Sequence, residues 1–468
     1  MDNVNNINEE STGQVLSREN RMGTQPEGRL LWSMGVPLSL SMLTQALYNI
    51  VDSIFVSRLG ENALTAVSLA YPMYMLMIAV SVGTGVGINS LISRRLGAKR
   101  FEEANMAASN GLFLMLLSAL VFVLFGVFGA GPFIRAYTQT PEVQQMGATY
   151  LSIICTVCVG VFIQVLCERI MQAQGKNLYA MLMQLLGAVI NIIFDPILIF
   201  GLWGFPKMGI AGAAVATVAG QLISMCFSLV MVLSPRSEVR LRIRGFRPDG
   251  KSIRDIYQVG LPAIVMQGVG TVMNLAMNAI LIAFSETAVA LFGVYFKIQS
   301  IAIMPLIGVT NASMSIMAYN FGARNKSRLM RTFHLTVRAG ALMMLVMTGV
   351  FLLFPDAILS LFNASPDMLR IGRAALSIMP LCLPIAACNI SMSVVFQAVG
   401  NGMYSMFISL ARQLVVLVPA AWILARLTND VTAVWWSFPI AEVAAVLMSA
   451  YLLAKAYRNR IQPLEITV

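Results

Sequence analysis

Residues 37–60 of the chain read PLSLSMLTQALYNIVDSIFVSRLG. This stretch is long and apolar enough to cross a bilayer as a helix, yet it carries the carboxylate of Asp52 well inside. A charged Asp at the centre of such a helix costs roughly 2.5–3.5 kcal/mol. We interpret Asp52 as an ion-coupling residue of a membrane transporter. A structural Asp that neighbouring helices satisfy is the alternative.

The polar residues of this stretch share one side of the predicted helix. Gln45, Tyr48, Asn49 and Asp52 stand at positions i, i+3, i+4 and i+7. The opposite side is apolar and suited to lipid. We therefore expect the polar side to face the inside of a helix bundle, with Gln45 and Asn49 available to bind substrate.

The composition agrees with many membrane spans. The chain is 58% hydrophobic and 11% charged, with mean hydropathy +0.76, whereas soluble domains are about 45–50% apolar and about 25% charged. The formal charge of +11 comes from basic residues in short loops between apolar runs. This distribution is typical of membrane topology and not of a nucleic-acid surface. We expect lipids around the protein and no nucleic-acid partner.

Apolar segments predict an all-α membrane protein with twelve transmembrane helices. In the first half they fall at 32–56, 64–90, 107–131, 147–173, 177–201 and 209–234. In the second half they fall at 257–284, 288–316, 332–354, 371–398, 402–426 and 431–456. The domain prediction is a disordered tail (1–30), a six-helix lobe (31–234), a linker (235–255), a second six-helix lobe (256–457) and a tail (458–468).

The loop charges predict the orientation. Basic residues gather after the second, fourth, sixth and eighth helices and after the last one, while the opposite connections are poor in Lys and Arg. The positive-inside rule then places both termini in the cytoplasm. The single histidine, His334, has no partners for a triad or a metal cluster, so we do not expect an enzyme.

The chain repeats itself with one constant shift between its two halves. Identities at this shift include Gly35 with Gly260, Pro37 with Pro262, Asn49 with Asn274, Gly97 with Gly322 and Gly175 with Gly400. Because each half holds an even number of helices, the repeats are parallel. We expect substrate to bind between the halves and the protein to work by alternating access. Channels and flippases also use duplicated folds.

The two halves differ in their embedded acids. The constant shift pairs Asp52 with Met277, Glu168 with Ser393 and Asp195 with Ala420. A role in folding alone should be needed by both halves, whereas a chemical role can belong to one. This asymmetry favours a functional role for the three acids of the first half.

Further polar residues complete the predicted sites. In the fifth helix Asn191 and Asp195 share a face, and Thr217 of the sixth helix could join Asp52 and Asp195 in one cavity. Gln164 and Glu168 lie one turn apart near the cytoplasmic end and could bind a cationic substrate. In the second half the embedded polar residues include Asn274, Asn278, Lys297, Asn389 and Glu442. Each could hold substrate or simply join helices.

The coupling ion stays open between H⁺ and Na⁺, and we expect no other cofactor. Burial and a second carboxylate both favour the protonated form of an acid, which suits proton exchange. Sodium needs several oxygen ligands, which Asp52, Asn191 and Asp195 could supply. Pro37 and Pro196 interrupt helix hydrogen bonding, so each is either a gate or a static kink.

Several motifs resemble those of a known transporter family. QALYNIVDSIFVSRLG, SRRLGAKR, INIIFDPILIFG with GIAGAAVAT, and FGARN are similar to sequences of the multidrug and toxic compound extrusion (MATE) family. The similarity covers residues from about 30 to 457, and it resembles most the bacterial DinF-like and MepA-like branch.

The resemblance implies two six-helix lobes in a V and the exchange of amphipathic, often cationic drugs for H⁺ or Na⁺ across a bacterial inner membrane. We expect a monomer. The resemblance carries ion coupling to Asp52, Asn191, Asp195 and, more loosely, Thr217, and substrate binding to Glu168. Acids that serve a second-lobe sodium site in one branch have no counterpart here. A flippase for lipid-linked precursors is the alternative function.

Overall fold

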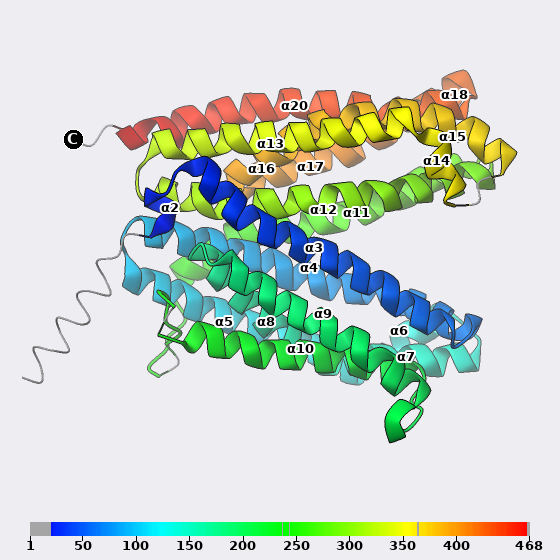
Figure 1. Cartoon of the computed structure of the whole chain (residues 1–468), viewed down its shortest axis with the longest axis horizontal. Coiled ribbons are helices and arrows are strands. Elements are labelled where there is room, and N and C mark those ends of the chain that lie inside the picture. The colour runs from blue at the N-terminus through cyan, green and yellow to red at the C-terminus, as the bar shows by residue number, and fades with distance from the viewer. Residues whose placement is uncertain (1–19, 236, 243, 363–364, 466–468) are drawn as a thin grey trace, which may run out of the picture.

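The computed structural model describes residues 20–235, 237–242, 244–362 and 365–465, and these are almost entirely helical. The N-terminal lobe contains a short helix, α2 (Arg21–Thr24), followed by six spans (Figure 1). These spans are α3 (Glu27–Ser57), α4 (Glu61–Gly97), α5 with η1 and α6 (Phe101–Arg135), α7 with α8 (Pro141–Thr156 and Val159–Ala173), α9 (Asn177–Phe200) and α10 (Ile210–Leu233).

The C-terminal lobe repeats this order. Its spans are α11 (Gly250–Leu281), α12 (Glu286–Gly322), α13 (Lys326–Leu353), α15 with η3 and α16 (Pro366–Ala398), α17 with η4 and α18 (Gly402–Thr428), and α19 with α20 (Val431–Val434 and Ser437–Ala456). A short helix, α14 (Pro355–Ser360), lies between α13 and α15.

Within the described residues, eleven helices are long and apolar enough to cross a membrane. The pair α7 and α8 forms a twelfth span if counted together, although it bends by 45°. The predicted all-α membrane architecture with twelve spans is therefore confirmed. Local sequence signals set several boundaries, such as Ser285, whose hydroxyl accepts the Ala288 amide at 3.1 Å and caps α12.

The internal repeat is visible in the backbone. Lys99 and Arg324, which follow α4 and α12, both have φ of 57°. Gly175 and Gly400, which follow α8 and α16, have φ of 76° and 78°. Each pair is related by the same shift as the sequence identities. The two lobes therefore share turn geometry as well as helix order.

The lobes touch each other closely at one end. A Cβ atom on Gly97 would lie 1.8 Å from the carbonyl oxygen of Tyr319, and one on Gly322 would lie 1.9 Å from that of Arg94. The two contacts are equivalent under the repeat. Only glycine permits such an approach between two helix backbones. We call this the closed end; by the positive-inside expectation it is cytoplasmic.

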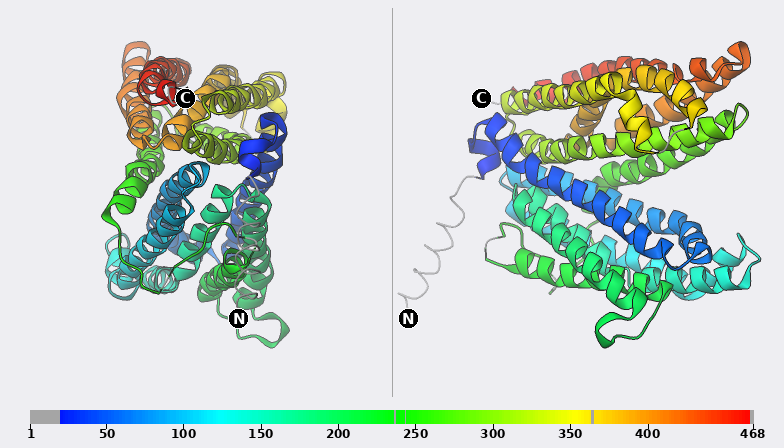
Figure 2. Two further views of the ribbon diagram at one scale, coloured as in Figure 1. Left: turned by 90° about the vertical axis from the view of Figure 1, so that its left-hand side faces the viewer. Right: turned by 45° about the vertical axis from the view of Figure 1, so that its right-hand side comes forward.

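From the closed end the lobes diverge (Figure 2). Asn89 of α4 is fully buried and its Oδ1 accepts the Ser315 hydroxyl of α12 at 3.2 Å. Tyr71 stands on the same face of α4, five turns farther on, and is 55% exposed. The face of α4 that is covered by the other lobe at Asn89 is therefore uncovered at Tyr71. We call the region between the lobes the interlobe opening.

The start of the chain corrects the domain prediction. Residues 20–30 were expected to belong to a disordered tail because they are polar, but the structure shows α2 there and begins α3 at Glu27. Met22 is fully buried. Residues 1–19 of the predicted tail lie outside the described residues. Tertiary contacts order a segment whose composition alone favours disorder.

These contacts join both lobes at the closed end. Asn20 Nδ2 donates to the Gln174 carbonyl at 3.2 Å, and Arg21 donates to the Gly175 carbonyl, both in the N-terminal lobe. The following residues bind the C-terminal lobe through Arg328, which donates to the carbonyls of Met22 (3.2 Å) and Gln25 (2.5 Å). We call residues 20–27 the N-terminal clasp.

The other end of the chain also extends beyond the predicted lobe. The second tail was expected from residue 458, but helical turns continue through η5 (Tyr457–Ile461) and η6 (Gln462–Glu465). Ile461 is fully buried, and Arg460 Nη1 donates to the Val399 carbonyl at 3.0 Å. Apolar burial and a charged hydrogen bond hold this segment against the lobe. The predicted linker likewise ends earlier, because α11 begins at Gly250.

Candidate functional site

The structure brings Asp52 of α3 and Asp195 of α9 together. Their carboxyl groups lie within hydrogen-bonding reach of each other. Asp195 is fully buried, and the buried Oδ1 of Asp52 has no hydrogen-bond donor among the described residues. Two carboxylates at this range repel each other unless a proton or another cation lies between them.

Asn191 connects Asp195 to the sixth span. With its amide turned so that the nitrogen faces the carboxylate, Asn191 donates to Asp195 at 3.2 Å. Its oxygen then accepts from the Thr217 amide and hydroxyl at 3.3 and 3.2 Å. All three side chains are buried. The four residues predicted for ion coupling, Asp52, Asn191, Asp195 and Thr217, therefore form one group.

Tyrosines surround this group. Tyr48 is hydrogen-bonded to Tyr74 of α4, and both lie near the Asp52 carboxyl, as does Tyr150 of α7. Sequence reasoning placed Tyr48 on the polar side of α3 but missed Tyr74 and Tyr150. Their helices carry no polar stripe, so only the tertiary structure identifies them as neighbours of the acids.

The two remaining polar residues of α3, Gln45 and Asn49, have different surroundings. Gln45 Oε1 accepts the Gln184 amide of α9 at 3.0 Å, and Gln184 also accepts from the Ser41 hydroxyl. Asn49 is exposed. Gln45 is thus engaged in holding α3 to α9, whereas Asn49 is available to a ligand.

No ion pair among the described residues involves Asp52, Asp195 or Glu168. The group around Asp195 instead presents carboxyl, amide and hydroxyl oxygens. Such a donor set fits either a proton shared by the two acids or a sodium ion. If Na⁺ binds, Asp52, Asn191 and Asp195 would hold it, and Thr217 could add an oxygen.

Glu168 lies apart from this group. It is 8% exposed, and Gln164 Nε2 donates to its Oε1 at 3.0 Å. The neighbouring Arg169 is close enough to interact with Glu168 electrostatically, but it forms no ion pair with it among the described residues and donates to Gln172 at 2.9 Å. The structure thus brings the predicted substrate residues Gln164 and Glu168 together near the closed end of α8. It does not bring them to Asp52.

Asn274 and Asn278 lie on α11 of the other lobe, and both are half-buried. They take no part in the group around Asp195. A ligand that touched both sets would have to extend across the interlobe opening.

The C-terminal lobe contains an embedded acid of its own. Glu442 of α20 is 7% exposed and forms an ion pair with Arg412, which stands in the π-helical turn η4 (Ala411–Leu417). Asn389 Nδ2 donates to Glu442 Oε2 at 2.8 Å, and Ser449 donates to Asn389 at 2.9 Å. The sequence marked Glu442 and Asn389 only as embedded polar residues and missed Arg412.

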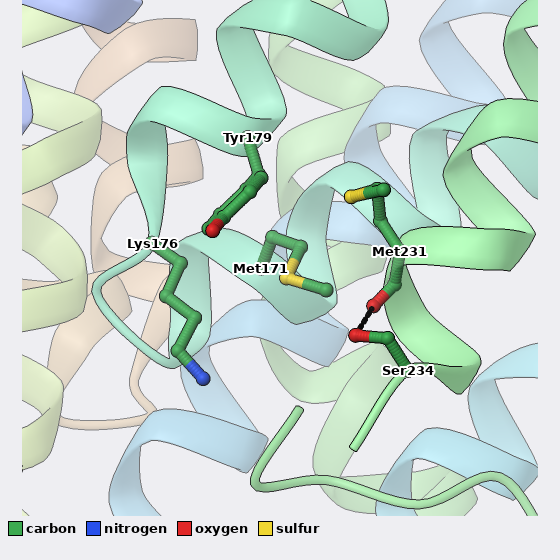
Figure 3. A pocket seen from close by; sticks show the side chains of 5 residues that line it. All are labelled: Met171, Lys176, Tyr179, Met231 and Ser234. Atoms are coloured by element: carbon green, nitrogen blue, oxygen red, sulfur yellow. Dashed lines mark hydrogen bonds between the residues drawn. The ribbon is translucent and has the colours of Figure 1, made fainter. Parts of the chain in front are cut away.

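A small pocket opens at the closed end of the N-terminal lobe (Figure 3). Its lining residues are Met171, Lys176, Tyr179, Met231 and Ser234. Ser234 donates to the Met231 carbonyl at 2.9 Å, and Lys176 lies 3.7 Å from Glu238. None of the five lining residues belongs to the groups around Asp195, Glu168 or Glu442, so this pocket is separate from them.

Comparison with known proteins matches the repeat directly. The MatE family profile covers residues 37–197 and again residues 262–423, one match in each lobe. The two matches begin at Pro37 and Pro262, which the internal repeat also pairs. Together they span more than half of the chain. This chain belongs to the MatE family. MatE membership identifies a multi-pass membrane transporter and not an enzyme.

Relatives of this MatE protein include exporters. It is 24% identical to the multidrug export protein MepA of Staphylococcus haemolyticus over 92% of this chain and 94% of the relative. It is 26% identical to an FAD transporter of Shewanella oneidensis over 91% and 94% of the two chains.

Solved structures of MATE and MOP superfamily transporters have the same fold as this chain. A multidrug resistance MATE transporter of the MOP superfamily in an outward-facing conformation has a TM-score of 0.88 at 26% identity, covering 96% of this chain and 99% of that one. A MOP superfamily transporter from Pyrococcus furiosus, described as having a binding pocket of reverse polarity, gives a TM-score of 0.87 at 26% identity with the same coverage.

Proposed function

We propose that this MatE protein exports amphipathic, often cationic compounds from the cytoplasm in exchange for H⁺ or Na⁺ by alternating access. Asp52, Asn191, Asp195 and Thr217 bind the coupling ion. Glu168, Gln164, Gln45, Asn49, Asn274 and Asn278 are the substrate-binding candidates. The protein acts as a monomer in the bacterial plasma (inner) membrane, with both termini cytoplasmic.

The observation that carries the proposal is the contact between Asp52 and Asp195 without a protein cation. Two adjacent acids away from bulk water need a positive charge to coexist. Because no Lys or Arg of the described chain supplies it, an exchangeable cation must do so. The occupancy of this site then changes the interactions between α3 and α9.

That change can reach the interlobe contacts through α3. This helix packs against α9 of its own lobe and α12 of the other. The Ser39 hydroxyl donates to the Pro305 carbonyl of α12 at 2.8 Å. Pro37 lies beside this contact and weakens the hydrogen bonding of α3. A movement of α3 on ion binding would therefore be transmitted to the second lobe.

Glu168 would serve the cytoplasmic side of the cycle. It lies near the closed end, so it becomes accessible from the cytoplasm only after the lobes separate there. An embedded carboxylate at this position attracts a cationic group. Gln164, bonded to it at 3.0 Å, would fix the orientation of the carboxylate.

The test uses sealed vesicles that contain the purified protein and a cationic dye. Dye transport is measured with a proton gradient alone and then with a sodium gradient alone, for the wild type and for Asp52→Asn and Asp195→Asn. Transport driven by one gradient and lost in both variants supports the proposal. Wild-type rates in both variants would refute the assigned ion site.

A further inference from the structure

One basic residue of the C-terminal lobe lies in the wall of the interlobe opening. Lys297 and Ser315 of α12 are separated by five full helical turns, so they share one face of the helix. Ser315 is fully buried and bonds to Asn89 of α4 in the other lobe. Lys297 is exposed. It therefore points toward the N-terminal lobe where the lobes have separated.

The residue opposite is identified by the same spacing. Tyr71 precedes Asn89 on α4 by five full turns and shares its face. Tyr71 and Lys297 therefore lie five turns outward from the contact between Asn89 and Ser315, on the facing sides of α4 and α12. An aromatic ring that is 55% exposed stands on one wall and an ammonium group on the other.

Two amides extend the polar wall on α11. Asn274 and Asn278 follow Ile256 and Gly260, respectively, by five full turns. Ile256 and Gly260 pack against α4, because a Cβ on Gly87 would lie 2.1 Å from the Ile256 carbonyl and 3.0 Å from the Gly260 amide. Asn274 and Asn278 therefore face the interlobe opening as Lys297 does.

Lys297 differs from the embedded arginines. Arg412 pairs with Glu442, and Arg169 donates to Gln172. No ion pair among the described residues involves Lys297, and the polar residues placed on the same wall of the opening are the amides Asn274 and Asn278. A cation at this depth without a carboxylate lacks a structural reason that the described contacts supply.

We propose that Lys297 binds an anionic group of the transported compound, so that the preferred cargo is an amphipathic zwitterion. This inference rests on the proposed transport function and narrows its substrate class. The carboxylate or phosphate of the cargo pairs with Lys297, its flat apolar part contacts Tyr71, and its cationic group faces the acidic lobe. Asn274 and Asn278 donate to the remaining oxygens of the anionic group.

The experiment compares two dyes that differ at one group. A rhodamine methyl ester is a cation, and the same rhodamine with a free carboxylate is a zwitterion. Fluorescence anisotropy gives the Kd of each dye for the purified protein in detergent. The variants are Lys297→Gln and Lys297→Arg, with Lys455→Gln at the exposed end of α20 as the matched control.

Lys297→Gln should raise the ratio of the carboxylate Kd to the ester Kd about fivefold, which corresponds to a half-solvated pair worth about 1 kcal/mol. Lys297→Arg should restore the wild-type ratio, and Lys455→Gln should leave it unchanged. A merely structural role would shift both dyes alike. An equal shift, an unchanged ratio, or no binding of the carboxylate dye to the wild type would overturn the inference.

A transport measurement distinguishes a failure of this inference from a failure of the proposed function. If neither ion gradient drives efflux of either dye by the wild type, ion-coupled export fails, while the Kd ratio still decides the role of Lys297. If the ester is transported but Lys297→Gln leaves the ratio unchanged, only the role of Lys297 fails.

Discussion

The two lobes place carboxylates inside the membrane under opposite conditions. In the N-terminal lobe, Asp52 and Asp195 face each other with no protein cation beside them among the described residues. In the C-terminal lobe, Glu442 is paired with Arg412 and held by Asn389. One lobe therefore pairs its embedded acid with an arginine, and the other places two acids together with no protein cation beside them among the described residues.

This difference separates two uses of a buried charge. A carboxylate paired with an arginine of its own lobe already has a positive partner, so it needs no ion from outside the protein. A pair of acids without a partner changes its charge whenever the ion arrives or leaves. The repeat supplies the same scaffold twice, and under the proposed function the placement of Arg412 would separate a lobe with a fixed ion pair from a lobe that binds the coupling ion.

The largest expected effect comes from neutralising the acid pair. Asp195→Asn should reduce ion-driven dye transport at least about 100-fold, because the amide cannot exchange a proton and binds sodium poorly; this loss corresponds to about 2.7 kcal/mol. Initial transport rates in vesicles measure it. Asp367→Asn, a change at an exposed carboxylate in the first turn of α15, is the control and should transport normally. Normal transport by Asp195→Asn would remove the distinction between the lobes.

The second prediction concerns stability. Glu442→Gln should destabilise the protein by about 3–5 kcal/mol, because it leaves the Arg412 charge without its partner. Thermal unfolding in detergent measures this loss, and Arg412→Gln combined with Glu442→Gln should recover part of it. Asp52→Asn removes an acid without a cationic partner, so it should not lower the unfolding temperature. A similar loss in Asp52→Asn and Glu442→Gln would mean that the lobes treat their acids alike.

The third prediction tests the connection between the lobes. Arg328→Gln should weaken the N-terminal clasp, because it removes the charged hydrogen bonds to the Met22 and Gln25 carbonyls and the ion pair with Glu27. Such bonds contribute about 1.5–3 kcal/mol each. Labelling of a cysteine placed at Met22 should become faster in this variant. Arg331→Gln, one turn along α13 and exposed, is the matched control. Unchanged labelling would show that the clasp does not hold the closed end.

The smallest expected effect is at the start of the second lobe. Asp249 accepts the hydroxyl and amide of Ser252 at 2.6 and 2.9 Å, and these bonds hold the pKa of Asp249 below its usual value. Its cap therefore stabilises α11 above about pH 4, and the contribution is lost as the pH falls through the lowered pKa of the folded state. Asp249→Ala should cost about 1 kcal/mol at neutral pH.

Amide exchange in the first turn of α11 measures this change. It should be faster in Asp249→Ala at pH 7, and acidification should bring the wild type toward the variant. The start of α3 has no side-chain cap and serves as the internal reference. Equal exchange in wild type and variant at pH 7 would contradict the prediction.

The sequence predicted the features that depend on spacing within a single helix. Apolar length predicted the spans, and the polar side of α3 with Asn191 and Asp195 of α9 predicted the group that the structure assembles. Tyr74 and Tyr150 could not be found this way, because they reach the group from helices without a polar stripe.

The Arg412 pair was missed for a different reason. Arg412 and Glu442 stand on different spans, in η4 and α20, and they are 30 residues apart in the sequence. No spacing along a single helix brings them together, so only the packing of the two spans shows the pair. The clasp was missed because its polar composition resembles that of a tail, and only contacts with both lobes order it.

The paired glycines at the closed end have a mechanical consequence. Where Gly97 and Gly322 meet the opposing backbones, no Cβ atom separates the two helices, so their axes lie as close as the backbones allow. A single added methyl group at either position would act as a wedge. It would force the two helices apart at the closed end, so Gly97→Ala or Gly322→Ala should weaken the contact between the lobes there.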